Sequence, residues 1–273
     1  MDKRTFYDEI QSKRIDIPRA ALLFAREIAY PNLEVSAWLG YLDDLAESAR
    51  SFILPNQSVI ERAEALGDFL FVHERFQGNV HEYSDPRNSY LNQVLERRLG
   101  IPISLSVVYL ALAERLGVPA LGIGLPGHFI VGIPVSEEMY FLDPFYGGNR
   151  LSIEDCSQLV LQATGYAGPL QKEWLQPISS RAILTRMLNN LRNVYFQSEQ
   201  WELALRVIEH LRALHPDLPD WLRDLGLIYQ RQGALRWAIQ SYEEYLSRAP
   251  SAPDARAVRL RLQEAVRDLA KLN

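Results

Sequence analysis

Hydrophobic residues recur at helical spacing through most of the first half of the chain. Pro18 opens a predicted helix that runs through the apolar stretch 20–25 and ends before Pro31. Two further amphipathic stretches predict helices over residues 33–52 and 60–76. A period of about 3.6 residues is typical of helices that pack one face on a shared core.

A turn precedes the most apolar helix. Segment 83–92 is rich in turn residues and leads into a helix through Arg98, for which Asn88 or Ser89 is the expected N-cap. The next predicted helix covers residues 102–116 and ends at a glycine.

The periodicity then changes to that of strands, with short apolar segments separated by Gly, Pro and Ser. The predicted strands are residues 120–124, 129–133 and 139–143. The turn Gly147-Gly148-Asn149 is expected to end the sheet region, and a helix resumes near Ser152. Turn residues dominate 165–177, which is the expected boundary between two domains.

Beyond that boundary, similar residues recur at an interval of 34 positions. Small residues such as Gly226 and Ala238 allow the helices of one hairpin to approach closely, and Tyr242 fills space between hairpins. A proline stops the second helix. The pairs at this interval are Leu191 and Leu225, Tyr195 and Tyr229, Ala204 and Ala238, Ile208 and Tyr242, and Pro216 and Pro250.

This segment resembles the tetratricopeptide repeat family, which implies an all-helical domain over residues 179–273 that follows a first domain over 1–178. The repeats are expected at 185–218 and 219–252, with a closing helix at 254–271. Two and a half repeats are near the minimum for independent stability, which leaves open a packing of the repeats on the first domain.

The charge balance excludes one class of partner. A net charge of −5 argues against a general nucleic-acid binder, which normally carries a basic excess. From Arg181 onward the chain holds 14 basic and 11 acidic residues, a net of +3. The remainder holds 15 against 23, a net of −8, so the two parts are expected to attract each other.

A single cysteine, Cys156, excludes an intrachain disulfide and favours a reducing compartment. The polar N-terminus predicts no signal peptide, and the longest apolar run, 101–113, is too short to span a bilayer. No cluster of cysteine and histidine has the spacing of a zinc site. The sequence therefore predicts a cytoplasmic protein with no metal, no cofactor and no membrane partner.

His128 begins one predicted strand and Asp143 ends the next. The midpoint between them falls between Val135 and Ser136, where a hairpin is expected to turn, and this register places the two side chains roughly 5 Å apart. A carboxylate beside an imidazole fixes its tautomer and stabilises its protonated form, as the base of a catalytic triad requires. A purely structural role for the pair stays open.

A wider resemblance rests on four motifs that follow one another in order. They are Asn88-Ser89-Tyr90-Leu91-Asn92, Gly100-Ile101-Pro102-Ile103-Ser104-Leu105-Ser106, Pro126-Gly127-His128-Phe129 and Leu142-Asp143-Pro144-Phe145. The chain resembles the transglutaminase-like superfamily and, more narrowly, the SirB family, whose members join such a core to C-terminal tetratricopeptide repeats. This resemblance implies a papain-like α+β core, in which a central helix packs on an antiparallel sheet, with a Cys-His-Asp site.

The chain departs from this family at the nucleophile. In active members the cysteine stands in a Gly-x-Cys at the N-terminus of the central helix, where the helix dipole and the histidine lower its pKa. That motif falls on residues 100–102, so Pro102 occupies the cysteine position and supplies no nucleophile. Cys156 follows both other site residues in the chain and cannot substitute. Ser104 is a candidate if the helix starts one or two residues later than expected, and Ser106 lies one turn further along.

In tetratricopeptide repeats, the inner face of the first helix of each hairpin contacts the ligand. Two arginines and two asparagines in one groove are expected to grip a carboxylate or an acidic peptide through charge-assisted hydrogen bonds. A solvated polar face is the alternative. The expected peptide-binding residues are Arg186, Asn189, Asn193, Arg223 and Gln230.

Three functions follow from these observations. The first is a non-catalytic transglutaminase-like adaptor or regulator that binds protein or peptide through its repeats. The second is a serine-based hydrolase or acyl transferase that uses Ser104, His128 and Asp143. The third is an enzyme-like pocket that only binds a small ligand.

Overall fold

The segment Pro102–Leu116 is apolar on nearly every side and forms α6, the most deeply buried helix of its unit. Only Leu110, Glu114 and Arg115 of its residues are not buried. Proline suits the first position of a helix, because its missing N–H has no intrahelical partner there. A helix that is apolar all round must be covered on every face, so α6 becomes the centre around which the other elements pack.

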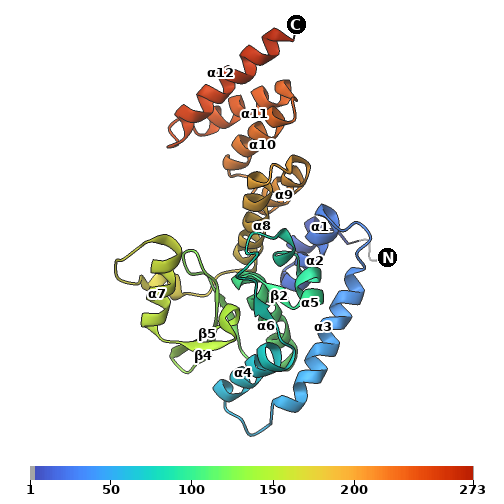
Figure 1. Cartoon of the computed structure of the whole chain (residues 1–273), viewed down its shortest axis with the longest axis vertical. Helices are drawn as coiled ribbons and strands as arrows, with labels where there is room; N and C mark the ends of the chain where they lie inside the picture. The colour runs from blue at the N-terminus through green and yellow to red at the C-terminus, as the bar shows by residue number, and fades with distance from the viewer. Residues whose placement is uncertain (1–3, 273) are drawn as a thin grey trace. The chain divides into compact units, whose positions relative to one another are not determined.

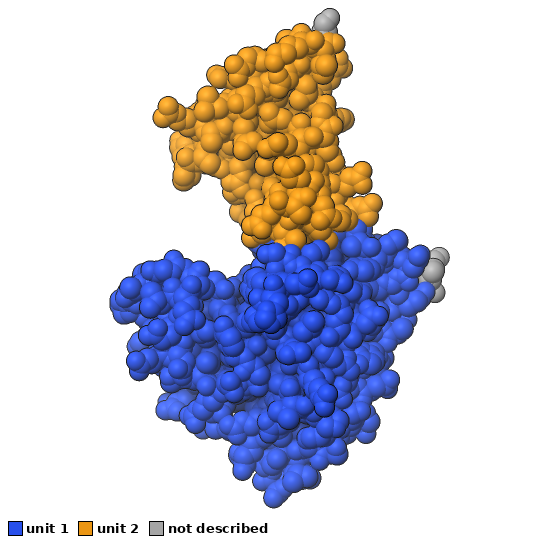
Figure 2. All heavy atoms as spheres, in the orientation of Figure 1, with its two compact units in different colours: residues 1–190 blue, residues 191–273 orange. Residues whose placement is uncertain are grey.

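The computed structural model describes residues 4–272. They divide into two compact units between Asn190 and Leu191 (Figure 2). The division falls inside α8 (Ser180–Gln197), whereas the sequence-based boundary lies at 178/179. Among the described residues, no helix combines the length and the apolar character that crossing a membrane requires.

In the first unit, helices cover one side of α6 and a sheet covers the other (Figure 1). This arrangement confirms the expected α+β class, with a central helix against an antiparallel sheet. The helices are α1 (Phe6–Ile10), α2 (Ile17–Ile28), α3 (Val35–Ala49), η1 (Arg50–Phe52), α4 (Val59–Gly67), η2 (Asp68–His73), η3 (Pro86–Asn88), α5 (Leu91–Arg97), α6, η4 (Pro144–Tyr146), α7 (Ile153–Thr164) and η5 (Lys172–Leu175).

Four strands form the antiparallel sheet in the order β3-β4-β5-β6. They are β3 (Leu121–Ile123), β4 (Ile130–Val135), β5 (Glu138–Asp143) and β6 (Asn149–Leu151), and a separate parallel pair joins β1 (Gln77–Gly78) to β2 (Leu99–Gly100). The expectation that the sheet ends at Gly147-Gly148-Asn149 is wrong. Both glycines take left-handed conformations, φ 78° and 74°, and turn the chain back so that β6 pairs with β5.

The helix expected over 60–76 is present: α4 continues without a break into η2, a π-helix that ends at His73. The expected N-cap of α5 is wrong, because the amide of Asn88 is buried and donates to the carbonyl oxygen of Glu82 at 2.7 Å. Tyr90 precedes the helix instead, without a side-chain capping bond.

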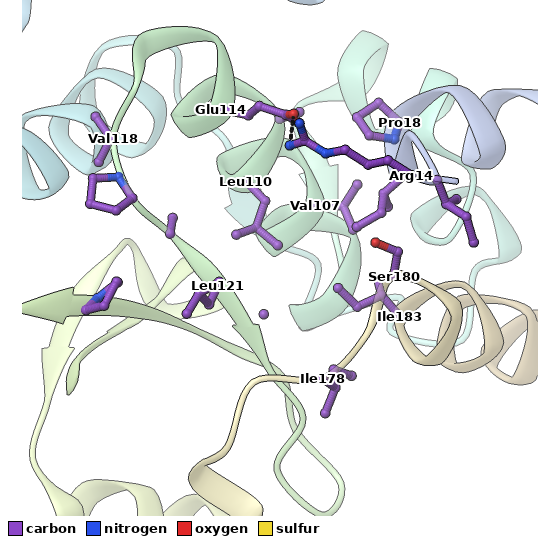
Figure 3. A pocket seen from close by; sticks show the side chains of 17 residues that line it. Arg14, Pro18, Val107, Leu110, Glu114, Val118, Leu121, Ile178, Ser180 and Ile183 are labelled. Atoms are coloured by element: carbon purple, nitrogen blue, oxygen red, sulfur yellow. Dashed lines mark hydrogen bonds and ion pairs between the residues drawn. The ribbon is translucent and has the colours of Figure 1, made fainter. Parts of the chain in front are cut away.

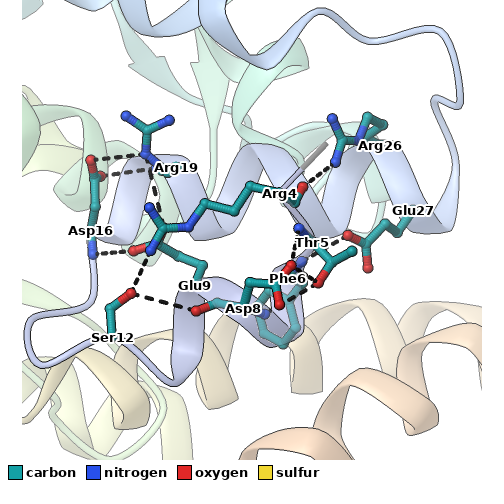
Figure 4. A network of polar contacts seen from close by, with 10 residues as sticks. All are labelled: Arg4, Thr5, Phe6, Asp8, Glu9, Ser12, Asp16, Arg19, Arg26 and Glu27. Carbon is teal, nitrogen blue, oxygen red and sulfur yellow. Dashed lines mark hydrogen bonds and ion pairs between the residues drawn. The ribbon is translucent and has the colours of Figure 1, made fainter. Parts of the chain in front are cut away.

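A network around Glu9 ties the first two helices together (Figure 4). Glu9 is 1% exposed; its Oε1 accepts from the Asp16 amide at 3.0 Å, and its Oε2 lies 3.0 Å from Arg4 Nε. Arg19 also faces this carboxylate, with its Nε 3.9 Å from Oε2. A buried carboxylate requires such partners, because removing them strands the charge at a cost of about 3–5 kcal/mol.

The second unit consists of antiparallel helical hairpins, as the repeat predicts. From Ser180 to Leu272 the described chain contains helices and turns and no strand. After α8 come α9 (Trp201–Leu214), α10 (Asp220–Arg231), α11 (Leu235–Arg248) and the closing helix α12 (Ala255–Lys271).

The small residue at position 226 has the predicted role. A Cβ placed on Gly226 would lie 2.4 Å from two ring carbons of Tyr242, so only glycine allows α10 and α11 to approach this closely. One repeat earlier the same position holds Arg192, whose side chain is 23% exposed and pairs through Nε with Asp224 at 2.7 Å. The departure from glycine in the first copy is therefore accommodated by an ion pair.

Candidate functional site

The N-terminal end of α6 carries the position at which the family resemblance places a nucleophile. Pro102 is the first helical residue, and Ile101 is the N-cap, with extended backbone. Isoleucine has no polar side chain, so it cannot cap the free N–H groups of the first turn. This end of α6 therefore presents partial positive charge but no nucleophilic group.

Ser104 lies in this first turn, but its hydroxyl is used inside the fold. Its Oγ donates to the carbonyl oxygen of Asn88 at 2.6 Å and accepts from the Ile101 amide at 3.0 Å, and the residue is 0% exposed. Because the helix starts at Pro102, the later start that Ser104 requires as a nucleophile is not met. Ser106 is equally buried, and its Oγ has no hydrogen-bond partner among the described residues.

His128 and Asp143 are joined by a hydrogen bond of 2.8 Å between Nε2 and Oδ2. Asp143 is fully buried and His128 is 8% exposed. The second carboxylate oxygen, Oδ1, accepts from the Phe145 amide at 2.9 Å. The carboxylate is thus held from both sides and fixes the orientation of the imidazole.

The predicted contact between these residues is present, but the predicted register is wrong. Val135 pairs with Glu138, so the hairpin turns at Ser136-Glu137, one position later than expected. Ser136 takes a left-handed conformation, φ 55°, at the first turn position. His128 consequently precedes β4 and reaches Asp143 diagonally, a separation that long side chains span.

A cavity of about 180 Å³ opens beside His128. It brings the histidine together with Pro102, the residue at the nucleophile position, and with three polar residues from the first turns of α8. Its lining consists of Tyr83, Ile101, Pro102, Ile103, Gly127, His128, Phe129, Arg186, Asn189 and Asn190. Pro102, at the position where the family resemblance expects the nucleophile, therefore lines the same cavity as His128 and has no nucleophilic side chain.

Arg186 is part of this cavity. Its Nη2 donates to the carbonyl oxygens of Leu125 at 2.9 Å and His128 at 2.7 Å, and its guanidinium lies 5.5 Å from the centre of the Phe129 ring. Burial lowers the pKa of Arg186, and the Tyr83 hydroxyl opposes this effect. The arginine therefore holds the backbone that carries His128 while its charge remains at the cavity wall.

Aromatic rings surround the imidazole. The ring of Tyr146 stacks on His128 at 6.1 Å with an angle of 22°, and Phe145 approaches edge-on at 6.1 Å and 84°. Tyr83 contacts Phe145 and remains 49% exposed at the rim of the cavity. Partial burial is the main cause that raises the pKa of Tyr83, so its hydroxyl stays protonated and available as a donor at neutral pH.

Cys156 is remote from nucleophilic chemistry. It is 0% exposed in α7 and packs in an apolar cluster with Ile130 and Val160. Burial, with smaller contributions from the charges of Asp155 and Asp143, raises the pKa of the thiol to about 12. A thiol in this state is protonated and shielded, which agrees with the interpretation that Cys156 does not replace the missing nucleophile.

A second, larger cavity of about 400 Å³ lies in the same unit (Figure 3). Its walls are mainly apolar, with Val107 and Leu110 from α6 and Ile183 from α8. The charged residues at its edge, Arg14 and Glu114, pair with each other.

The five expected peptide-binding residues do not form one set. Arg186 and Asn189 line the cavity beside His128 in the first unit, and Asn193, Arg223 and Gln230 belong to the second. The sequence placed Arg186 and Asn189 in the repeat groove because they fall on the first repeat helix. Their neighbours are set by the first unit instead, because the first turns of α8 pack there.

The remaining members are engaged to different degrees. Arg223 lies 2.6 Å from an oxygen of Asp254 and 3.1 Å from one of Asp224. These ion pairs already neutralise its charge, so it is not available to bind an acidic ligand. Gln230 accepts from the Tyr242 hydroxyl at 2.8 Å. Asn193 remains exposed, with one contact of 3.3 Å from Arg192.

Sequence reasoning missed three residues of the site: Tyr83, Tyr146 and Asn190. Asn190 adjoins a predicted residue and was within reach of a helical projection. Tyr83 sits in a turn, and Tyr146 in the short helix η4, and neither has a sequence pattern that indicates proximity to the histidine. Among residues 4–272, no three side chains of the His, Cys, Asp and Glu types gather as a metal site.

Comparisons with known proteins agree with both units. Residues 36–189 match the transglutaminase-like superfamily, and residues 191–263 match the tetratricopeptide repeat. A UPF0162 protein of Xylella fastidiosa is 36% identical over 253 residues, which cover 92% of this chain and 90% of that protein.

Two other relatives extend over similar shares. UPF0162 protein YchA of Escherichia coli is 30% identical over 236 residues, 85% of this chain and 86% of that protein. Protein SirB1 of Salmonella typhimurium is 28% identical over 245 residues, 88% of this chain and 86% of that protein. The similarity therefore spans both units and preserves their order.

Proposed function

Because the chain belongs to the transglutaminase-like superfamily and to the UPF0162 family that includes SirB1, we propose that it is a non-catalytic adaptor whose repeats bind a protein or peptide. The observation that carries the proposal is the shared cavity of Pro102 and His128. The His128–Asp143 pair is suited to act as a base and its carboxylate, whereas Pro102 on the same cavity wall has no group able to attack a substrate.

The loss of a nucleophile has a large effect on rate. A triad that lacks one member retains only the contributions of binding and of an oxyanion site, about 10³–10⁴-fold over water. Ser104 does not replace it, because its proton is donated to the carbonyl oxygen of Asn88 and the side chain is fully buried. Retention of the His128–Asp143 pair has a structural reason, since removal of either partner strands the other in a buried site.

The repeats support the adaptor part of the proposal. Tetratricopeptide hairpins build extended surfaces suited to peptides and protein segments. Of the expected ligand-binding residues, Asn193 has an exposed side chain and is our candidate contact in the repeat unit. The single cysteine, buried and unpaired, suits the reducing cytoplasm in which we expect the protein to act.

The absence of catalysis is tested with an active-site reagent. We expect the intact protein to form no covalent adduct with a fluorophosphonate, as measured by intact-mass spectrometry. His128→Ala serves as the matched variant. A stoichiometric adduct on Ser104 that His128→Ala abolishes would replace this proposal with a serine-based acyl transfer in which Asp143 orients the base.

The adaptor role is tested separately with a photo-crosslinking amino acid. Placed at Asn193 in the full chain, it is expected to capture a defined protein in cells. The same group at Val72, an exposed position of the first unit at 71%, is the control. Identical crosslinking patterns from the two positions would contradict binding through this face of the repeats.

A further inference from the structure

The cavity beside His128 contains a half-buried positive charge, that of Arg186, which no carboxylate neutralises. Arg186 uses its Nη2 for the carbonyl oxygens of Leu125 and His128, which are neutral groups. Within residues 4–272, no Asp or Glu oxygen lies within 4.0 Å of its guanidinium. None of the ten lining residues is acidic, and the carboxylate of Asp143 is bonded to the imidazole and the Phe145 amide.

The same cavity holds hydrogen-bond donors without partners. A guanidinium has five N–H donors, of which the two on Nη2 are used here. The side-chain amides of Asn189 and Asn190, both half-buried at the lining, have no hydrogen bond among the described residues. The uncapped end of α6 at Ile101 adds the partial positive charge of its first turn.

We propose that this cavity binds a carboxylate, carried either by a small free acid or by the C-terminal residue of a peptide. The planar guanidinium matches a carboxylate in shape and charge. A phosphate, with a charge of about −1.5 to −2, exceeds the single uncompensated charge of the site. A volume of about 180 Å³ holds about six waters, which fits a molecule of a few carbon atoms or one terminal residue.

This inference rests on the proposed non-catalytic function: a cavity that has no nucleophile can bind the carboxylate ligand without reacting with it. The ligand enters beside His128, whose Nε2 is already bonded to Asp143. The side-chain amides of α8 are placed to donate to the carboxylate oxygens together with Arg186. Binding of this kind adds a charge-assisted contact and leaves the imidazole–carboxylate pair unchanged.

The test compares two ligands that differ only in charge. N-acetylglycine carries the carboxylate, and N-acetylglycinamide is its neutral counterpart. Titration of the full protein is followed by the imidazole proton NMR signals of His128, assigned with His128→Ala, and by thermal shift. We expect a saturable shift with N-acetylglycine and none with the amide at the same concentration. Equal responses to both, or none to either at millimolar concentration, would overturn the proposal.

Two variants locate the interaction. Asn189→Asp keeps the size of the side chain and adds a negative charge to the cavity wall, so we expect binding at least about tenfold weaker. Asn56→Asp makes the same change at an exposed turn of the first unit that does not line the cavity, and this variant is expected to bind as wild type does. Arg186→Met is expected to abolish binding, and Asn189→Asp keeps the test decisive if that variant misfolds. Unaltered binding by Asn189→Asp would refute the site.

A second pair of ligands separates the two sources of the carboxylate. A tetrapeptide with a free C-terminus is compared with its C-terminal amide. Tighter binding of the free peptide than of N-acetylglycine assigns the cavity to peptide ends, and the reverse order assigns it to small acids; both outcomes support the carboxylate. A fluorophosphonate adduct would overturn the absence of catalysis without affecting these titrations, so the two proposals fail independently.

Discussion

Replacing Pro102 by cysteine tests whether the cavity is a nucleophilic site that lacks only its nucleophile. Pro102 is the first residue of α6 and lines the same cavity as His128. A thiol there gains the field of an uncapped helix terminus and the proximity of the imidazole, the two features that lower cysteine pKa values. We therefore expect Pro102→Cys to carry a reactive thiolate, in contrast to Cys156.

The size of the effect follows from the ionisation of the thiol. An ordinary cysteine has a pKa of about 8.5, and activated ones fall between about 3.5 and 7.5. With a pKa of about 6, half the thiol is ionised at pH 6, against about 0.3% of an ordinary one. The lower basicity reduces the reactivity of each thiolate by roughly tenfold, so the net gain in alkylation rate at pH 6 is about tenfold.

The assay is alkylation by iodoacetamide between pH 5 and 9, followed by peptide mapping. The wild type provides the blank, because its one cysteine, Cys156, is fully buried. The double variant Pro102→Cys, His128→Ala is the matched control and is expected to show a rate profile with a midpoint near that of a free thiol, about 8.5. If the single variant Pro102→Cys also shows a midpoint of about 8.5, residue 102 is not close enough to His128 and the helix terminus for them to activate a thiol.

Three further predictions concern packing and burial. In Gly226→Ala the added Cβ overlaps the Tyr242 ring, which costs about 1–3 kcal/mol, while alanine improves helix propensity by about 1 kcal/mol. The repeat unit is expected to be destabilised in urea unfolding by the difference. Gly40→Ala, where an added Cβ meets nothing within 4 Å, is expected to stabilise by about 0.5–1 kcal/mol, and the same sign for both would refute the close approach. Ser106→Ala removes a buried hydroxyl without a partner and is expected to raise stability by about 1 kcal/mol, so a lower melting temperature would point to an undetected role for it. Cys156, with a pKa of about 12, is expected to react with Ellman's reagent at pH 8 only after unfolding, and rapid reaction of the native protein would contradict its burial.

The helices and the repeat could be predicted from local patterns in the sequence. The repeat is visible in the sequence because each copy is one hairpin, in which residues such as Gly226 and Tyr242 lie close together along the chain. The approach of His128 and Asp143 was also predictable, since both flank one hairpin and a single turn joins their strands. The start of α6 at Pro102 was visible for a similar reason, because proline precedes a continuous apolar run.

Tertiary structure decided what faces the histidine. Ser104 and Ser106 looked equivalent as hydroxyls near a helix start. In the fold, Ser104 donates to the carbonyl of Asn88, sixteen positions earlier, whereas the Oγ of Ser106 has no hydrogen-bond partner among the described residues. Arg186 fits the repeat pattern by sequence, yet it bonds to the carbonyl of His128, 58 residues away.

The physical reason for this difference is the range of the interactions. Which face of an element is buried and where a helix ends depend on neighbours a few residues away. Hydrophobic periodicity therefore predicts the buried face, and proline or glycine predicts the helix end. Residues of α8 up to Asn190 belong to the first unit, so Arg186 and Asn189 take their partners from that unit. The sequence thus determined which elements form and which residues bear chemistry, and only long-range packing determined that Arg186, Asn189 and Pro102 share a cavity with His128.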